Sequence, residues 1–427
     1  MYLKELKPLQ RLNLMDCLLN GKDMVHVAES LKNLLNLVSL DVSCNNLGGT
    51  AASLVMRLKE LKPLQRLNLR NCSLNGQDMV HVAESLRDLP NLASLDVSCN
   101  NFGGTAASLG IHLKELKPVQ RLNLMGCSLN GKDMVHVAES LKDLPNLVSL
   151  DVPGNNLGGT AASWGMHLKD LKPLQELDLG DCSLNGKDMV HVAESLKDLP
   201  NLVSLHVSCN NLGGTAASWG MRLKELKPLQ ELNLFNCSLN GQDMAHVAES
   251  VKNLFNLVSL IVSYNYLGGT AASWGMYLKE LKPLQRLKLV RCSLNGQDMV
   301  HVAEALRDLP NLARLDVSGN NLGGTAASWG MFLKELKPLQ ELDLSSCSLN
   351  GQDMVHVAKS LKELPNLVSQ IVSGNTDLAG TATSWCLYLK HAKALRKLDL
   401  RYCWPTEEDK KHIHDVLSNL DELLLYR

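Results

Sequence analysis

The sequence predicts an α/β solenoid, an elongated stack of strand–turn–helix ribs with a parallel sheet along one side. The main observation is a period of 55 residues, because the segment that begins at Leu9 returns at Leu64, Val119, Leu174, Leu229, Leu284 and Leu339, and one residue late at Leu395. A second, related series starts at Leu37 and continues to Leu367, so each unit holds two repeats of 28 and 27 residues. A fixed period in this range is typical of stacked ribs.

Each repeat opens with a short strand. The pattern L-x-x-L-x-L places apolar residues at period two, as in Leu9, Leu12 and Leu14, and this alternation predicts a strand. The leucines then point inward and the residues between them point to solvent. The register is fixed, since a slip of one residue would bury the charged positions.

A helix follows each strand. In the 28-residue repeat, Asn20 is a good N-cap and Asp23 adds negative charge to the first turn. One apolar stripe follows, formed by Met24, Val27, Ala28, Leu31 and Leu34. The 27-residue repeat carries a comparable stripe from Ala51 to Leu61. Because strand, turn and helix fit in under 30 residues, successive strands must be parallel, with the helices as an outer layer and the strands as an inner sheet.

The repeats predict sixteen ribs in one domain, residues 1–427, of which 1–402 are regular and 403–427 form an irregular capping rib. Two departures predict local irregularity: Gln370 replaces a framework leucine, and Asn375–Leu378 contains one extra residue. In the last rib Thr406 and Asp409 have the spacing of a helix cap. The final strand is expected within residues 420–425.

Composition excludes several classes of function. The net charge is -1 and the pI about 6.9, with no sustained basic run, so a nucleic-acid footprint is not expected. No apolar stretch approaches the roughly 18–20 residues of a membrane span, and charges near Met1 argue against a signal peptide. Eight cysteines, from Cys17 to Cys403, recur on alternate ribs about 10 Å apart, too far for a disulfide. Reduced thiols suit a cytoplasmic location.

The repeats resemble the leucine-rich repeat superfamily, and in particular its ribonuclease-inhibitor-like subfamily. The residues that carry this resemblance are L-x-x-L-x-L-x-x-C-x-L at Leu9–Leu19 and L-x-x-L-x-V-x-x-N-x-L at Leu37–Leu47. The resemblance implies a horseshoe with the sheet on its concave face and the helices on its convex face. It also implies that the Cys or Asn at the ninth position hydrogen-bonds to the backbone of the turn.

Three classes of function follow from this resemblance. The first is the ligand-sensing or autoregulatory repeat region of an intracellular NOD-like immune receptor. The second is a free-standing protein like ribonuclease inhibitor, which inhibits an enzyme by wrapping it. A GTPase-activating repeat protein or a designed scaffold is a third reading. Met1–Lys4 align with Met276–Lys279, so the chain is expected to begin inside a helix, as a fragment whose missing N-terminal domains are themselves possible partners.

Differences between copies predict where a partner binds. The helix surfaces hardly change, whereas the outward strand positions vary, and Phe235 and Tyr264 lie with Ile261 and Val290 on three consecutive strands. Aromatic residues on a rigid surface are typical of interaction hot spots. Diversification for binding is therefore favoured over neutral drift, although one helix position (His112, Tyr277, Phe332) varies too. The predicted concave protein-binding site comprises Phe235, Ile261, Tyr264, Val290, Arg286, Lys288, Arg291, His206, Glu176, Asp178, Asp181 and Glu231.

No catalytic centre, cofactor or metal site is predicted. The sequence lacks a nucleophile elbow, a P-loop and a CxxC motif, and a regular array places the same groups on every rib. The repeated histidines, such as His26, recur too far apart to share a metal ion. The repeated tryptophans (Trp164, Trp219, Trp274, Trp329 and Trp385) are expected to pack between helices.

Overall fold

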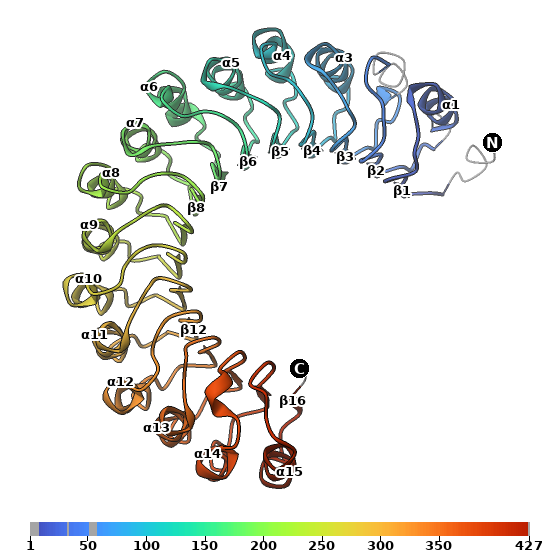
Figure 1. Cartoon of the computed structure of the whole chain (residues 1–427). Coiled ribbons are helices and arrows are strands. Elements are labelled where there is room, and N and C mark those ends of the chain that lie inside the picture. The colour runs from blue at the N-terminus through green and yellow to red at the C-terminus, as the bar shows by residue number, and fades with distance from the viewer. Residues whose placement is uncertain (1–7, 32–33, 51–57, 426–427) are drawn as a thin grey trace. The chain divides into compact units, whose positions relative to one another are not determined.

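The computed structural model describes residues 8–31, 34–50 and 58–425, and these form two compact units that meet in sequence between Asn210 and Asn211. In each unit the strands lie on the inner, concave side of a curved array and the helices on the outer, convex side (Figure 1). The α/β solenoid predicted from the sequence is confirmed. A single domain over the whole chain stays a prediction.

Within each unit, every strand of the described residues contains three residues and pairs in parallel with its neighbour in sequence. In the first unit the strands are β1 Arg11–Asn13, β2 Ser39–Asp41, β3 Arg66–Asn68, β4 Ser94–Asp96, β5 Arg121–Asn123, β6 Ser149–Asp151, β7 Glu176–Asp178 and β8 Ser204–His206. In the second they are β9 Glu231–Asn233, β10 Ser259–Ile261, β11 Arg286–Lys288, β12 Arg314–Asp316, β13 Glu341–Asp343, β14 Ser369–Ile371, β15 Lys397–Asp399 and β16 Glu422–Leu424. The last strand lies where the sequence predicts it.

The helices of the 28-residue repeats are α1 Gly21–Leu31, α3 Gly76–Leu86, α5 Gly131–Leu141, α7 Gly186–Leu196, α9 Gly241–Val251, α11 Gly296–Leu306, α13 Gly351–Leu361 and α15 Glu407–Val416. Those of the 27-residue repeats are α4 Ala106–Leu113, α6 Ala161–Trp164, α8 Ala216–Leu223, α10 Ala271–Leu278, α12 Ala326–Leu333 and α14 Ala382–Leu389. After α6 the chain continues as the 3₁₀-helix η2, Gly165–Asp170. The predicted helices at residues 1–7 and 51–57 lie outside the described residues.

The core lies between the sheet and the helices of each unit. The framework leucines are buried, and Leu232 at the centre of β9 has no solvent exposure. Trp219, Trp274 and Trp329 are buried as completely, which confirms that the tryptophans pack inside. Each rib therefore buries its apolar stripe only against its neighbours, as a solenoid requires.

The ninth position of each repeat ties a rib to the one before it. Asn265 Oδ1 accepts hydrogen bonds from the backbone N–H groups of Cys237 (3.0 Å) and Leu239 (2.9 Å), and its Nδ2 donates to the carbonyls of Leu234 (2.9 Å) and Val262 (2.8 Å). One amide thus makes hydrogen bonds to four backbone groups of the interior.

Cysteine has the corresponding role on the alternate ribs. The Sγ of Cys292 lies 3.3 Å from the carbonyl of Val262 in the preceding rib. Burial raises the pKa of Cys292 to about 12, and the same cause raises the pKa of Cys182 and Cys347 to about 12. These thiols are therefore weak nucleophiles. Their free state in solution stays a prediction.

A buried aspartate caps two helices at once. Asp243 Oδ2 accepts from the N–H of Asn240, the N-cap of its own helix α9 (3.1 Å), and from Gly214 of the preceding rib (2.8 Å). Asp243 Oδ1 accepts from the N–H of Ala216 at the start of α8 (3.2 Å). The N-cap of α8, Thr215, makes no capping bond with its side chain. The carboxylate of α9 therefore stabilises the positive end of α8 as well.

Both predicted departures from regularity are present. Gln370 is fully buried in β14, and its Oε1 has no hydrogen-bond partner. The extra residue after Asn375 is absorbed by the 3₁₀-helix η3, Thr376–Leu378. Thr406 and Asp409 form a capping box on α15, as their spacing predicts. Among the described residues, no helix is long and apolar enough to cross a membrane.

Candidate partner-binding surface

The twelve predicted binding residues divide between the two units. Glu176, Asp178, Asp181 and His206 belong to the first unit, and the other eight belong to the second. In both units the strand residues among them occupy outward positions of the sheet, between buried leucines. Binding by these twelve residues stays a prediction.

An aromatic patch lies where the strands of the second unit end. We define it as Phe235, Ile261, Tyr264, Tyr266 and Val290. The rings of Phe235 and Tyr264, from adjacent ribs, have centroids 4.8 Å apart with an interplanar angle of 51°, a tilted geometry that aromatic pairs favour. Tyr264 is 40% exposed and Tyr266 72% exposed. Phe235, Ile261 and Val290 are half-buried rather than open, because side chains of neighbouring ribs shield one another.

Tyr264 occupies a backbone conformation that disfavours its side chain. Its φ is +60°, and Arg291 at the equivalent position of the next rib has φ +48°. Some ribs hold glycine at this position, as at Gly319 (φ +70°) and Gly374 (φ +71°), and others hold a smaller side chain, as at Cys209 (φ +57°); glycine adopts such angles without steric cost. For a residue with a Cβ the left-handed region costs about 1–2 kcal/mol. Strain kept at a surface position is a reason to look for function there.

The regular array imposes this strain. The N–H of Tyr264 donates to the carbonyl of Val290 (2.7 Å), and the N–H of Arg291 donates to that of Ser318 (2.8 Å). Each bond continues the pairing between ribs beyond the end of the strands. The Arg291 guanidinium carbon lies 5.5 Å from the centroid of the Tyr264 ring, within the range of a cation–π contact. A cation thus borders the patch.

A charged pocket of about 340 Å³ lies at the opposite ends of the same strands. Its lining includes Glu231, Arg286 and Arg314 at outward positions of β9, β11 and β12, together with Gln285 and Gln340. The Arg314 Nε lies 4.0 Å from Glu341 Oε2. Lys288 lies on the outward face of β11. In the sequence it stands between Arg286, which lines this pocket, and Val290, which belongs to the aromatic patch.

The differences between copies within the chain did not indicate the two glutamines of the charged pocket. Gln285 and Gln340 precede β11 and β13, and glutamine recurs at this position in many ribs. A residue that does not vary carries no signal of diversification. The two glutamines could have been predicted from their position directly before Arg286 and Glu341, which are the first outward residues of β11 and β13.

The acidic candidates of the first unit are partly neutralised. Glu176 forms an ion pair with Arg121, and Asp178 Oδ2 lies 4.0 Å from His206 Nδ1. Burial raises the pKa of Asp151 above its usual value, and the nearby carboxylates of Asp178 and Glu176 raise it further. The outward face of β6 and β7 is therefore a region of closely spaced carboxylates.

Comparison with known proteins agrees with this architecture. The model of the leucine-rich repeat family matches residues 33–56, 88–109 and 198–218. Two solved structures share the fold: a leucine-rich repeat protein of Leptospira interrogans (TM-score 0.59, 20% identity, 99% of this chain and 97% of that chain) and an internalin of Listeria monocytogenes (TM-score 0.57, 18% identity, 89% and 94%). The chain therefore contains leucine-rich repeats and shares the fold of these proteins.

The chain is also similar in sequence to two groups of proteins. It is 27% identical to the ribonuclease inhibitor of Sus scrofa over 79% of this chain and 76% of that protein. It is 28% identical to NLR family CARD domain-containing protein 4 of Rattus norvegicus over 72% of this chain, and 27% identical to NACHT, LRR and PYD domains-containing protein 12 of Homo sapiens over 70%. The match spans only 30% and 29% of those two receptors. Its homologues are thus ribonuclease inhibitors and NLR proteins.

Proposed function

We propose that this chain is a non-catalytic module that binds a protein through the concave face of its second unit. The observation that carries the proposal is the aromatic patch, in which the large side chain of Tyr264 stands at a backbone position with positive φ. Tyr264 and Arg291 keep their side chains there at a cost in stability, and Phe235 packs against Tyr264. Exposed aromatic residues with arginine at their edge have the composition of interaction hot spots.

The charged pocket complements this patch. A ligand lying along β9–β12 would meet aromatic rings at one end of the strands and Arg286, Arg314 and Glu231 at the other. Charged groups of this kind orient a partner and speed its association more than they tighten binding. The surface is therefore suited to a protein with an apolar anchor flanked by charge.

The wider role that we propose is ligand sensing or autoregulation in an intracellular NOD-like receptor. The similarity to NLR proteins over about 70% of this chain supports that role. In this reading the partner is a protein ligand or another domain of the same receptor. No cofactor enters the proposal, because binding depends on side chains of the sheet alone.

The double variant Phe235→Ala/Tyr264→Ala tests the binding surface. We expect proteins captured from cytosolic extract by the wild-type chain to be depleted with this variant, and a purified partner to lose about 2 kcal/mol or more of binding free energy. The matched control is Phe255→Ala, since Phe255 is 72% exposed on the loop between α9 and β10. Equal capture by the double variant and the wild type would place the binding surface elsewhere.

Inhibition of a ribonuclease is the second candidate function. The length of the match favours it, because the similarity extends over 76% of the pig ribonuclease inhibitor but only about 30% of the NLR proteins. The carboxylates of β6 and β7 would suit a basic enzyme. A pancreatic-type ribonuclease assayed with increasing amounts of this chain tests the idea, and undiminished ribonuclease activity would exclude it.

A further inference from the structure

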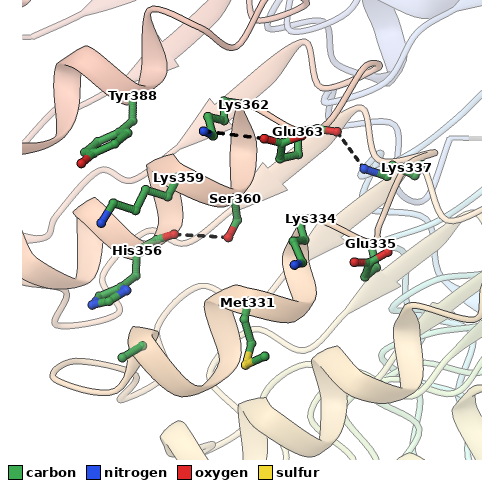
Figure 2. A pocket seen from close by; sticks show the side chains of 11 residues that line it. Met331, Lys334, Glu335, Lys337, His356, Lys359, Ser360, Lys362, Glu363 and Tyr388 are labelled. Carbon is green, nitrogen blue, oxygen red and sulfur yellow. Dashed lines mark hydrogen bonds and ion pairs between the residues drawn. The ribbon is translucent and has the colours of Figure 1, made fainter.

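A groove of about 610 Å³ lies on the convex face of the second unit, between α12, α13 and α14. Figure 2 shows its lysines together with Tyr388 and Met331. Four lysines line it against two glutamates, Glu335 and Glu363, with His356 beside them. Two corresponding grooves of the same chain, between α10 and α11 and between α4 and α5, have volumes of about 230 and 320 Å³. These repeats provide an internal comparison.

Three of the four lysines belong to the repeat framework, because Lys334, Lys337 and Lys362 stand where the preceding 55-residue repeat has Lys279, Lys282 and Arg307. Lys337 Nζ donates to the carbonyl of Glu363 at 3.0 Å, as Lys282 Nζ does to the carbonyl of Asp308 at 3.1 Å in the preceding unit of the repeat. Lys362 Nζ lies 3.7 Å from the carboxylate of Glu363. In Figure 2 both of these lysines are joined to Glu363 by dashed lines. Both lysines therefore already have a partner in this chain, a backbone carbonyl for Lys337 and a carboxylate for Lys362.

Lys359 distinguishes this groove from the others. Glutamate occupies its position in all the preceding copies of the helix, at Glu29, Glu84, Glu139, Glu194, Glu249 and Glu304. The groove between α10 and α11 therefore has two cations, Lys279 and Arg307, against two carboxylates, Glu304 and Asp308. Where Lys359 stands instead of glutamate, an electrically balanced groove becomes one with an excess of positive charge.

An aromatic ring lies opposite Lys359, and the same position holds Tyr277 opposite Glu249 in an earlier copy. In the first unit Glu84 faces His112 across the helices, with Oε1 3.6 Å from Nε2. At the corresponding place in the second unit, Lys359 Nζ lies 5.1 Å from the centroid of the Tyr388 ring. A cation–π contact holds the ammonium at the groove while leaving its N–H donors available. Among the described residues, no carboxylate pairs with Lys359 or with Lys334.

We propose that this groove is a second binding surface, specific for an acidic segment of a partner protein that is rich in Asp and Glu. Lys359 and Lys334 would pair with carboxylates of the segment. Met331, which is 56% exposed, and the Tyr388 ring offer apolar contact beside them. Charge complementarity selects this occupant, because the corresponding grooves, in which glutamate balances the cations, lack the excess of positive charge that would attract it. The proposal concerns the opposite face from the aromatic patch and does not depend on the function proposed above.

Binding of a fluorescently labelled oligoglutamate peptide to the full chain, followed by anisotropy at low salt, tests the proposal. We expect the wild-type chain to bind this peptide, and Lys359→Glu to weaken binding about tenfold, since the change removes an attraction and adds a repulsion. Lys359→Glu restores the residue of the other ribs, so the variant should fold normally. An unchanged melting temperature checks this.

The chain also offers a gain-of-function control. Glu304→Lys puts lysine at the same position of α11, so this variant should bind the oligoglutamate peptide with increased affinity or at an additional site. An oligoglutamine peptide should bind neither protein. The Phe235→Ala/Tyr264→Ala variant should bind oligoglutamate as the wild type does, which separates this surface from the concave one. Equal affinity of the wild type and Lys359→Glu for oligoglutamate, or no binding by the wild type, would overturn the proposal.

Discussion

Gln370 stands where neighbouring strands have a leucine, between Leu342 of β13 and Leu398 of β15. Its Nε2 donates to the carbonyl of Ile371 at 3.3 Å, but its Oε1 is buried without a partner. A buried polar group of this kind costs about 1–3 kcal/mol. The sequence identified the position as irregular, but only the structure shows that the amide stays inside instead of turning to solvent.

Gln370→Leu should therefore stabilise the second unit. We expect the free energy of unfolding to rise by about 1–3 kcal/mol, because leucine has a similar volume and leaves no unsatisfied oxygen. Chemical denaturation of the wild type and the variant measures the difference. Gln340→Leu is the matched control, since Gln340 is exposed and should give no gain. A less stable Gln370→Leu protein would show that the amide has a partner in solution.

The alternation of leucines predicts which side chains face outward, but not which of them make contact. The alternation of leucines correctly assigned Ile261 and Lys288 to the outward face. It could not foresee that Phe235 and Tyr264 make contact, because the seventh position of one repeat meets the eighth position of the next. That contact depends on the path of the chain after the strands end, where the φ of Tyr264 is +60° and the rule of alternating sides no longer holds.

Among the elements, the helices of the 27-residue repeats depend on their successors. Their caps were not predictable, because the carboxylate that serves α8 belongs to α9 and lies 27 residues further along the chain. The sequence does predict the local capping box, since Asn240 and Asp243 are three residues apart. Asp409 has the same double role, with α15 as its own helix and α14 as the one before.

Asp409→Asn should change how the last two helices respond to acid. Burial raises the pKa of Asp409, but hydrogen bonds from Ala382, Thr406 and Gly380 outweigh it and hold the pKa below its usual value. A lowered pKa in the folded state means that the carboxylate stabilises the fold above its unfolded pKa, about 3.9. That contribution is lost as the pH falls through the folded-state pKa.

Hydrogen exchange of α15 at several pH values checks this expectation. In the wild type, protection should fall as the solution is acidified, whereas in Asp409→Asn it should be lower at neutral pH and change less. Asp415→Asn, at an exposed position of the same helix, should behave like the wild type. Parallel pH curves for Asp409→Asn and the wild type would contradict the assigned role.

At the scale of the molecule, the period of 55 residues predicted most of the fold. It gave the order of the strands, their parallel pairing and the side on which the helices lie. It could not reveal the groove beside Lys359, because a single exchange of glutamate for lysine on a helix resembles the neutral variation of any surface. The structure shows that Lys359 packs against Tyr388 and that four lysines and two glutamates line the groove there.

Leu232→Ala should weaken the array locally. Leu232 is fully buried at the centre of β9, so its truncation should cost about 2–5 kcal/mol through lost transfer energy and a cavity. In a stack where ribs contact only their neighbours, such a loss separates the unfolding of the flanking ribs. Calorimetry should show a lowered or divided transition, and Asn233→Ala should leave it nearly in place. A single melting transition at the wild-type temperature would contradict the rib model.

The hydrogen bonds that Asn265 and Asp243 make to another rib all connect a later rib to the rib before it. This has a consequence for biosynthesis. While the chain emerges from the ribosome, the rib that ends with α8 lacks the carboxylate that completes its cap until Asp243 has also emerged. Each rib is therefore finished one rib late, and the growing end always carries one incomplete rib. A nascent chain paused at any point should expose its newest rib to chaperones and proteases, while the older ribs are already closed.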